Sequence, residues 1–288
     1  MRIVVSPGGP RQDGDGNKRY RPVMMDFDAR ANILATEVQD DWEPSIREQM
    51  YENQAKIRRE LIAQFGEQGF DAKLQNFIDL GAKPFSILAY HNQFLEQARF
   101  AFIIGAYYPA LVGACTLGER ILNHLVINLR QEFTTSPHYK HLYKKRSFDN
   151  WPKMIDALRD WEVLLPPVVN DLIALNSIRN NSVHFRHELD KDAREPALEA
   201  IRLLERIIDG QFSAFGTNQW FIPNITGASF LRREAEILPF IRLVFIPNCF
   251  LISNRHQMHF TYDGVMITDE FSDSRRELTD EEFASGEF

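Results

Sequence analysis

The chain has little cysteine and no long uninterrupted apolar run, and each shortage argues against a class of protein. Its two cysteines, Cys115 and Cys249, lie far apart in the sequence and outside any Cys-x-x-Cys motif. A structural zinc site and a disulfide framework are therefore not expected, and sparse cysteine is typical of a reducing cytosol. The best candidate for a membrane span, 100–127, is interrupted by proline and by charged and polar residues. The N-terminal apolar stretch is broken too early, at Pro7, to act as a signal peptide. We therefore expect a cytoplasmic protein that does not enter a membrane.

The chain also lacks net positive charge and a phosphate-binding loop. Its net charge of −7 argues against a generally basic nucleic-acid coat, although a local basic cleft remains compatible with it. The glycines between 8 and 16 are irregularly spaced, and no Gly-Lys-Ser/Thr follows them. His256 and His259 lack acidic or cysteine partners at metal-ligand spacing, and no Gly-x-Ser-x-Gly elbow surrounds a serine. We therefore expect neither a metal nor a cofactor.

Hydrophobic periodicity predicts a mainly helical chain. Prolines near the starts of apolar stripes and glycines at their ends mark the helix bounds. The predicted helices cover 44–65, 70–80, 91–104, 109–130, 151–161, 166 through the polar run ending at 184, and 196–215. Residues 7–21 are expected to form an exposed loop, and 137–147 a connector.

The last quarter of the chain has a different pattern. Short β-branched or aromatic runs predict strands at 241–245, 250–253, 258–262 and 265–268, and Asp263-Gly264 is a hairpin signal. A strand at 3–5 would join this small antiparallel unit. The acidic stretch 269–288 is expected to be mobile at its end. The predicted organisation is an N-terminal extension at 1–85, a helical bundle at 86–216 and a β-rich unit at 217–288.

One helix carries an unusual group of polar residues. Arg179, Asn180 and His184 lie together in the run 177–184. Cleavage of a phosphodiester bond needs a cation for the phosphate and groups that move and orient protons, and these side chains supply both. Residues four apart share a helix face, so Asn180 and His184 lie on one side, with Arg179 about 100° from Asn180. The run is therefore a candidate catalytic site.

A structural interpretation accounts for the same residues and stays open. Glu119 lies on the small-residue face of an apolar helix, where a carboxylate costs free energy unless it is paired. Arg179 could pair with it and have no catalytic role. In the functional interpretation, Glu119 positions Arg179 or the His184 imidazole.

The connector carries the clearest basic stretch. Lys140, Lys144, Lys145 and Arg146 could line an RNA path, with Tyr139 and Tyr143 stacking on bases. The alternative is a solvated connector without a ligand.

Two segments resemble the HEPN superfamily of helical bundles. Ala-Tyr-Tyr-Pro-Ala-Leu at 106–111, followed by Gly-Glu-Arg-Ile-Leu-Asn at 118–123, is similar to the second bundle helix of several HEPN families. Arg-Asn-Asn-Ser-Val-His at 179–184 resembles the family signature, in which an arginine is followed by a histidine after four to six residues. The resemblance covers about residues 90–215 and leaves out the N-terminal helices and the β-rich end.

The resemblance implies a HEPN-like bundle and a metal-independent endoribonuclease that acts as a homodimer. Two copies of the motif would face each other, with His184 moving protons, Arg179 binding the scissile phosphate and Asn180 orienting the site. RNA is then the expected substrate, an antitoxin or regulatory protein a further expected partner, and stress or antiviral defence the expected setting. The alternatives are a non-catalytic module that binds RNA or protein, and a helical scaffold.

Overall fold

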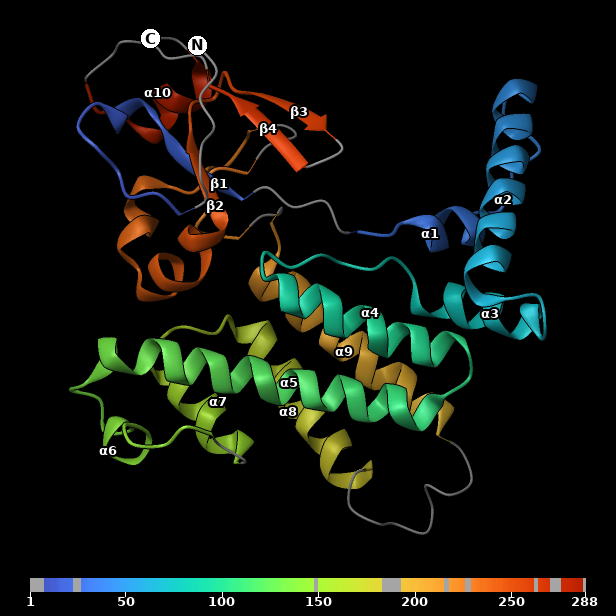
Figure 1. Ribbon diagram of the computed structural model, residues 1–288, viewed down its shortest axis with the longest axis horizontal. Coiled ribbons are helices and arrows are strands. Elements are labelled where there is room, and N and C mark those ends of the chain that lie inside the picture. The colour runs from blue at the N-terminus through green and yellow to red at the C-terminus, as the bar shows by residue number, and fades with distance from the viewer. Residues whose placement is uncertain are drawn as a thin grey trace. The chain divides into compact units, whose positions relative to one another are not determined.

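The chain folds into two compact units. The structure is a computed structural model, and it describes residues 8–22, 27–147, 150–182, 193–214, 218–225, 229–261, 264–269 and 276–286. We call 25–127 and 144–212 the bundle unit, and 1–24, 128–143 and 213–288 the sheet unit. The described chain is mainly helical with small antiparallel sheets, as the sequence predicted (Figure 1).

The helices of the bundle unit begin and end close to the predicted residues. They are α1 (Arg30–Ala35), α2 (Pro44–Phe65), α3 (Phe70–Leu80), α4 (Ala89–Ile103), α5 (Tyr107–Leu129), α7 (Trp151–Asp160), α8 (Pro166–Ser182) and α9 (Arg194–Phe212). Helices α2 and α3 match the prediction residue for residue. Pro44 occupies the first position of α2, and Gly66 follows its end with a φ of 79° that disfavours other residues.

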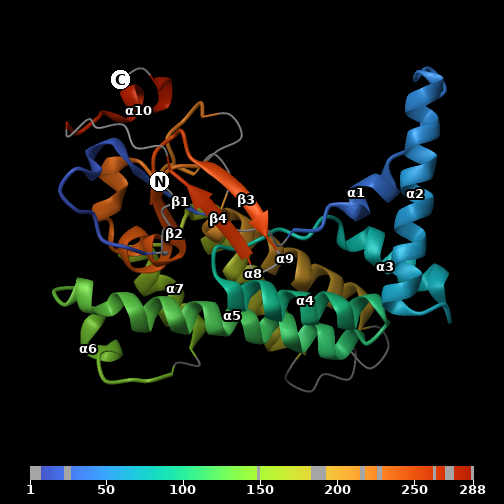
Figure 2. The same cartoon turned by 45° about the horizontal axis from the view of Figure 1, so that its top comes forward.

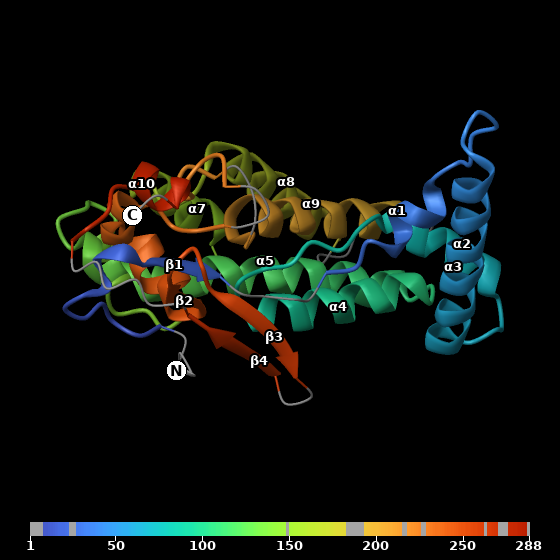
Figure 3. The same ribbon diagram turned by 90° about the horizontal axis from the view of Figure 1, so that it is seen from above.

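The bundle core lies between two layers of helices. Helices α4 and α5 form one layer, and α8 and α9 form the other (Figure 3). Helix α5 buries an apolar stripe that includes Leu111, Leu122 and Leu125. Among the described residues, Tyr107–Phe133 is the one helical stretch whose length and composition would suit a membrane span. The burial of its apolar stripe identifies α5 as a core helix of the bundle.

The sheet unit contains two antiparallel strand pairs. Strand β1 (Arg19–Pro22) pairs with β2 (Cys249–Ile252), and β3 (Gln257–Thr261) pairs with β4 (Gly264–Thr268). The shorter elements around them are η1 (Asp15–Asn17), η2 (Arg130–Phe133), α6 (Tyr139–Leu142), η4 (Arg233–Ile237), the π-helical η5 (Ile241–Phe245), η6 (Ile246–Asn248) and α10 (Asp280–Ser285). Strands β2, β3 and β4 confirm three of the predicted strands. The expected strand at 3–5 and the hairpin residue Asp263 lie outside the described residues.

The prediction of an exposed loop at 7–21 is wrong at its end. Arg19 begins β1 and is fully buried. Its Nε donates to Asp280 Oδ1 at 2.8 Å, and its guanidinium carbon lies 5.3 Å from the centre of the Phe283 ring. This polar residue therefore belongs to the interior of the sheet unit.

One further expectation for the C-terminal quarter is wrong. Residues 241–245 form η5 and not a strand, because Ile241, Val244 and Phe245 are buried together on one face of a helical turn. The acidic tail contains α10, whose Thr279 and Glu282 form a capping box. Phe283 of that helix is fully buried, so 280–285 belong to the fold.

The two units have bounds of their own, and the three expected segments stay a prediction. Residues 8–22 belong to the sheet unit, whereas 27–85 belong to the bundle unit. The first 85 residues are therefore divided between the two units.

Candidate functional site

The candidate site lies where α5, α7 and α8 meet. Glu119 Oε2 forms an ion pair with Arg179 Nη2 at 2.9 Å and accepts a hydrogen bond from Trp151 Nε1 at 3.2 Å. The Arg179 guanidinium carbon lies 5.8 Å from the centre of the Trp151 ring. The side chains of Glu119 and Arg179 are 33% and 24% exposed. This Glu119–Arg179–Trp151 cluster is thus open to solvent on its ionic side and anchored in the core by the indole.

Local sequence explains how the indole reaches Glu119. The side chain of Asn150 caps α7 by accepting from the backbone N–H of Lys153, and Trp151 is the first residue of that helix. Gly118 lets the ring approach α5, since a Cβ at that position would lie 2.7 Å from Trp151 Cη2. A buried indole N–H needs an acceptor, and the Glu119 carboxylate supplies it.

The cluster restricts the position of the Arg179 guanidinium, which has more N–H donors than its ion pair with Glu119 uses. A guanidinium has five N–H donors, and one described acceptor, Glu119, is bound to it. The ion pair and the indole limit the rotamers of Arg179, which reduces the entropy lost when it binds a further anion. A planar guanidinium at a partly exposed edge suits a phosphate group, which it can bind through two parallel hydrogen bonds.

Cys115 lies near the cluster but does not provide a nucleophile. Burial raises the pKa of its thiol to about 12, and the opposing charge of Arg179 offsets only part of that effect. The thiol is therefore protonated at neutral pH, and a protonated thiol is a poor nucleophile.

The structure brings together two of the four residues proposed for catalysis. Glu119 and Arg179 form the ion pair that the sequence allowed, and that pairing is confirmed. Asn180 is exposed on α8. His184 lies outside the described residues, because the described part of α8 ends at Ser182. The proposed shared face of Asn180 and His184 stays a prediction.

The basic connector is exposed at each of the four proposed RNA-binding residues. Lys140 belongs to the sheet unit, whereas Lys144, Lys145 and Arg146 belong to the bundle unit. The expected aromatic residues, Tyr139 and Tyr143, stack on each other, with ring centres 5.6 Å apart. A base would have to stack on an outer face of this pair or displace one ring.

Trp151 and Gly118 are the members of this arrangement that sequence reasoning missed. Trp151 was expected only as the start of a helix, and Gly118 only as one of several small residues. The available signal was the Gly-Glu step on an apolar helix, which combines a site of close approach with a carboxylate in need of donors.

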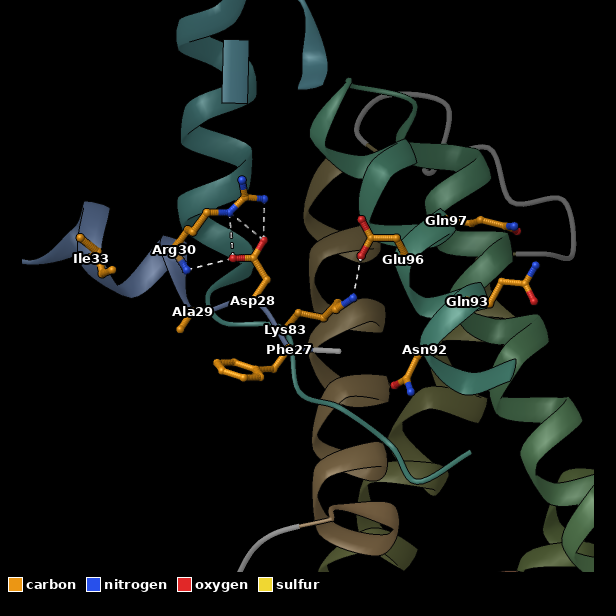
Figure 4. A pocket seen from close by; sticks show the side chains of 10 residues that line it. All are labelled: Phe27, Asp28, Ala29, Arg30, Ile33, Lys83, Asn92, Gln93, Glu96 and Gln97. Atoms are coloured by element: carbon orange, nitrogen blue, oxygen red, sulfur yellow. Dashed lines mark hydrogen bonds and ion pairs between the residues drawn. The ribbon is translucent and has the colours of Figure 1, made fainter. Parts of the chain in front are cut away.

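A concavity on the bundle unit shares no residue with the cluster (Figure 4). It has a volume of about 780 Å³ and lies between the segment around Arg30, Lys83 and the first half of α4. Lys83 Nζ binds Glu96 at 2.9 Å, and Arg30 binds Asp28 at 2.8 Å. Each of these cations therefore has a carboxylate partner, as Arg179 has in the cluster. Within the described ranges, no group of three or more His, Cys, Asp or Glu residues is arranged to hold a metal ion.

No protein-family model, curated protein or solved structure matches this chain. The case for a function therefore rests on the cluster and on the sequence motif that includes Arg179.

Proposed function

We propose that the chain is a HEPN-like, metal-independent endoribonuclease that acts as a homodimer. The observation that carries the proposal is the Arg179 guanidinium, held by Glu119 and Trp151 at a partly exposed edge of the bundle unit. His184 follows Arg179 by five residues in the sequence. The motif thus combines a restrained phosphate-binding cation with an imidazole close to it along the chain.

The proposed reaction is attack by a ribose 2′-hydroxyl on the adjacent phosphate. His184 of one subunit removes the 2′-hydroxyl proton, and the partner subunit's His184 gives a proton to the departing 5′-oxygen. The products are a 2′,3′-cyclic phosphate and a 5′-hydroxyl. Arg179 stabilises the charge that builds up on the phosphate, and Asn180 orients the reacting groups. The imidazoles carry the protons, so the mechanism requires no metal ion.

The homodimer follows from the number of groups that the reaction needs. Cleavage requires a base, an acid and a stabilising cation, whereas one copy of the motif has one histidine and one arginine. Two copies facing each other supply the second imidazole. Glu119 acts in this scheme as a positioning residue that holds Arg179.

Cleavage of total RNA in the presence of a chelator tests the proposal. We expect wild type to cleave, and folded Arg179→Ala and His184→Ala to lose cleavage. Arg206→Ala is the matched control, because Arg206 also forms a partly exposed ion pair, with Asp171 at 3.0 Å. It should cleave like wild type. A folded, dimeric His184→Ala that cleaves as fast as wild type would refute the mechanism.

Glu119→Gln tests the positioning role separately. The amide keeps an acceptor for the Trp151 N–H but loses the charge that holds Arg179. We expect cleavage to fall by about 10- to 100-fold while RNA binding changes little, because misplacement of a catalytic group affects the chemical step most strongly. An equal loss of binding and cleavage would indicate that Glu119 serves RNA affinity instead.

One observation favours a second candidate, a non-catalytic module that binds RNA or a protein. Arg179 is already paired within its own chain, which is what a structural role would require. In that case neither wild type nor Arg179→Ala would cleave RNA. If the module binds RNA, reversing the charges of Lys144, Lys145 and Arg146 should weaken binding and reduce its salt dependence.

A further inference from the structure

Helix α2 leaves most of its surface uncovered. It runs for 22 residues, and its buried side chains are Ile57, Leu61 and Phe65. This face packs against α1 and α3, beside which α2 stands in the bundle unit (Figure 2). By the rise of an α-helix, α2 is about 33 Å long, so a long exposed face remains.

Six residues on the exposed face repeat with the spacing of a coiled-coil seam. They are separated alternately by four and three positions, and each is exposed. This seam consists of Pro44, Glu48, Tyr51, Ala55, Arg58 and Ile62. Tyr51 is 59% exposed and Ile62 is 36% exposed, so the seam presents two large side chains with apolar surface to solvent. An average period of 3.5 residues keeps such a seam on one side of two supercoiled helices.

The seam is complementary to a second copy of itself only in the antiparallel direction. Antiparallel pairing centred on residue 53 places Glu48 opposite Arg58 of the other copy. It also places Tyr51 opposite the small Ala55, and Pro44 opposite the apolar Ile62. Parallel pairing would instead place Glu48 on Glu48 and Arg58 on Arg58, and like charges at such contacts are unfavourable.

The charges beside the seam support the same direction. The N-terminal end of α2 and the turn before it are acidic, and the C-terminal half is basic. The acids are Glu37, Asp40, Asp41, Glu43, Glu48 and Glu52, and the bases are Lys56, Arg58 and Arg59. The exceptions have partners within the chain, since Arg47 lies 3.9 Å from Asp40 and Glu60 lies 3.6 Å from Arg30. In an antiparallel pair, the acidic end of each α2 therefore lies beside the basic half of the other copy.

We propose that α2 associates with α2 of a second copy of this chain as an antiparallel, two-fold symmetric helix pair. Such an interface is isologous, because the same six residues contribute from both sides. The inference goes beyond the nuclease and does not rest on it. Association is measured as mass, whereas the nuclease is measured as RNA cleavage, so either proposal can fail alone.

Charge reversal on the two halves of α2 tests the pairing by sedimentation equilibrium. Variant one carries Lys56→Glu, Arg58→Glu and Arg59→Glu, and variant two carries Glu48→Lys and Glu52→Lys. We expect each variant alone at half the mass of the wild-type assembly of 33.5 kDa chains, since both variants lose the α2 contact and keep any contact between the two nuclease motifs. An equimolar mixture should return to twice the mass, because acidic and basic helices then meet along the whole seam. The chain with all five changes should also dimerise, since its two halves have only exchanged sign.

Circular dichroism shows whether each variant keeps its helix content. Lys153→Glu, on an exposed position of α7, is the matched control and should leave the mass unchanged. Three results would overturn the proposal: a monomeric wild type, variants that keep the wild-type mass, or variants whose mixture stays at half that mass.

Discussion

Gly118→Ala should destabilise the bundle unit, although alanine is the better helix former. A Cβ at this position would lie 2.7 Å from Trp151 Cη2 and 2.8 Å from Leu175 Cδ2. Both neighbours are fully buried, so neither can move aside without disturbing the core. Overpacking of this kind costs about 1–3 kcal/mol. The gain in helix propensity is about 1 kcal/mol, so we expect a net loss of about 1 kcal/mol in the free energy of unfolding.

Gly113→Ala in the same helix is the matched control. Its Cβ would lie 3.5 Å from Ala98 Cβ, which is an ordinary van der Waals contact. We expect this variant to gain about 1 kcal/mol from helix propensity alone. Urea unfolding followed by circular dichroism measures both changes, which should differ by about 2 kcal/mol and have opposite signs. The packing argument is refuted if Gly118→Ala stabilises the protein as much as Gly113→Ala does.

Three further predictions concern buried or capping residues. Burial, with a smaller effect from His124, lowers the pKa of His91 from 6.5 to about 3. The unfolded chain therefore binds a proton that the folded chain does not, so the free energy of unfolding should fall as the pH drops from about 6.5 toward 3. In urea titrations, His91→Gln should make the free energy of unfolding depend less on pH over this interval. Burial outweighs the charge of Arg99 and raises the pKa of Glu205 from 4.5 to about 7. The folded chain therefore holds a proton that the unfolded chain releases, so stability should fall as the pH rises from 4.5 to about 7, and Glu205→Gln should abolish this trend. Thr279 caps α10, because its Oγ1 accepts a hydrogen bond from the Glu282 N–H at 3.2 Å. Thr279→Ala should therefore lower the stability of α10 by about 1 kcal/mol, which faster hydrogen exchange in that helix would show.

The helix bounds of the bundle unit could be predicted because their signals are local. Proline at the first position of α2 and glycine after its end act within one turn of the residues that they affect. The short strands β3 and β4 were predictable for a similar reason, since they are adjacent in the chain and alternate over a few residues.

The sequence-based predictions were wrong mainly where a segment packs against residues that are distant in the sequence. Arg19–Pro22 follows glycine-rich turns and has the pattern of a loop, yet it pairs with Cys249–Ile252, which lies about 230 residues away. Residues 241–245 are rich in β-branched and aromatic side chains, but burial on one helical face outweighs that preference. The helical form of 280–285 depends on a pocket for Phe283, which the sheet unit supplies.

The candidate site divides in the same way. The sequence by itself determined the residue types at 119 and 179, the helices that carry them and the close approach that Gly118 permits. Only the tertiary structure decided that the carboxylate meets both the guanidinium and the Trp151 indole, because that contact requires α5, α7 and α8 to pack at one point. Helix periodicity places a residue on a face, but the partner on the opposite face is selected by packing between segments far apart in the chain.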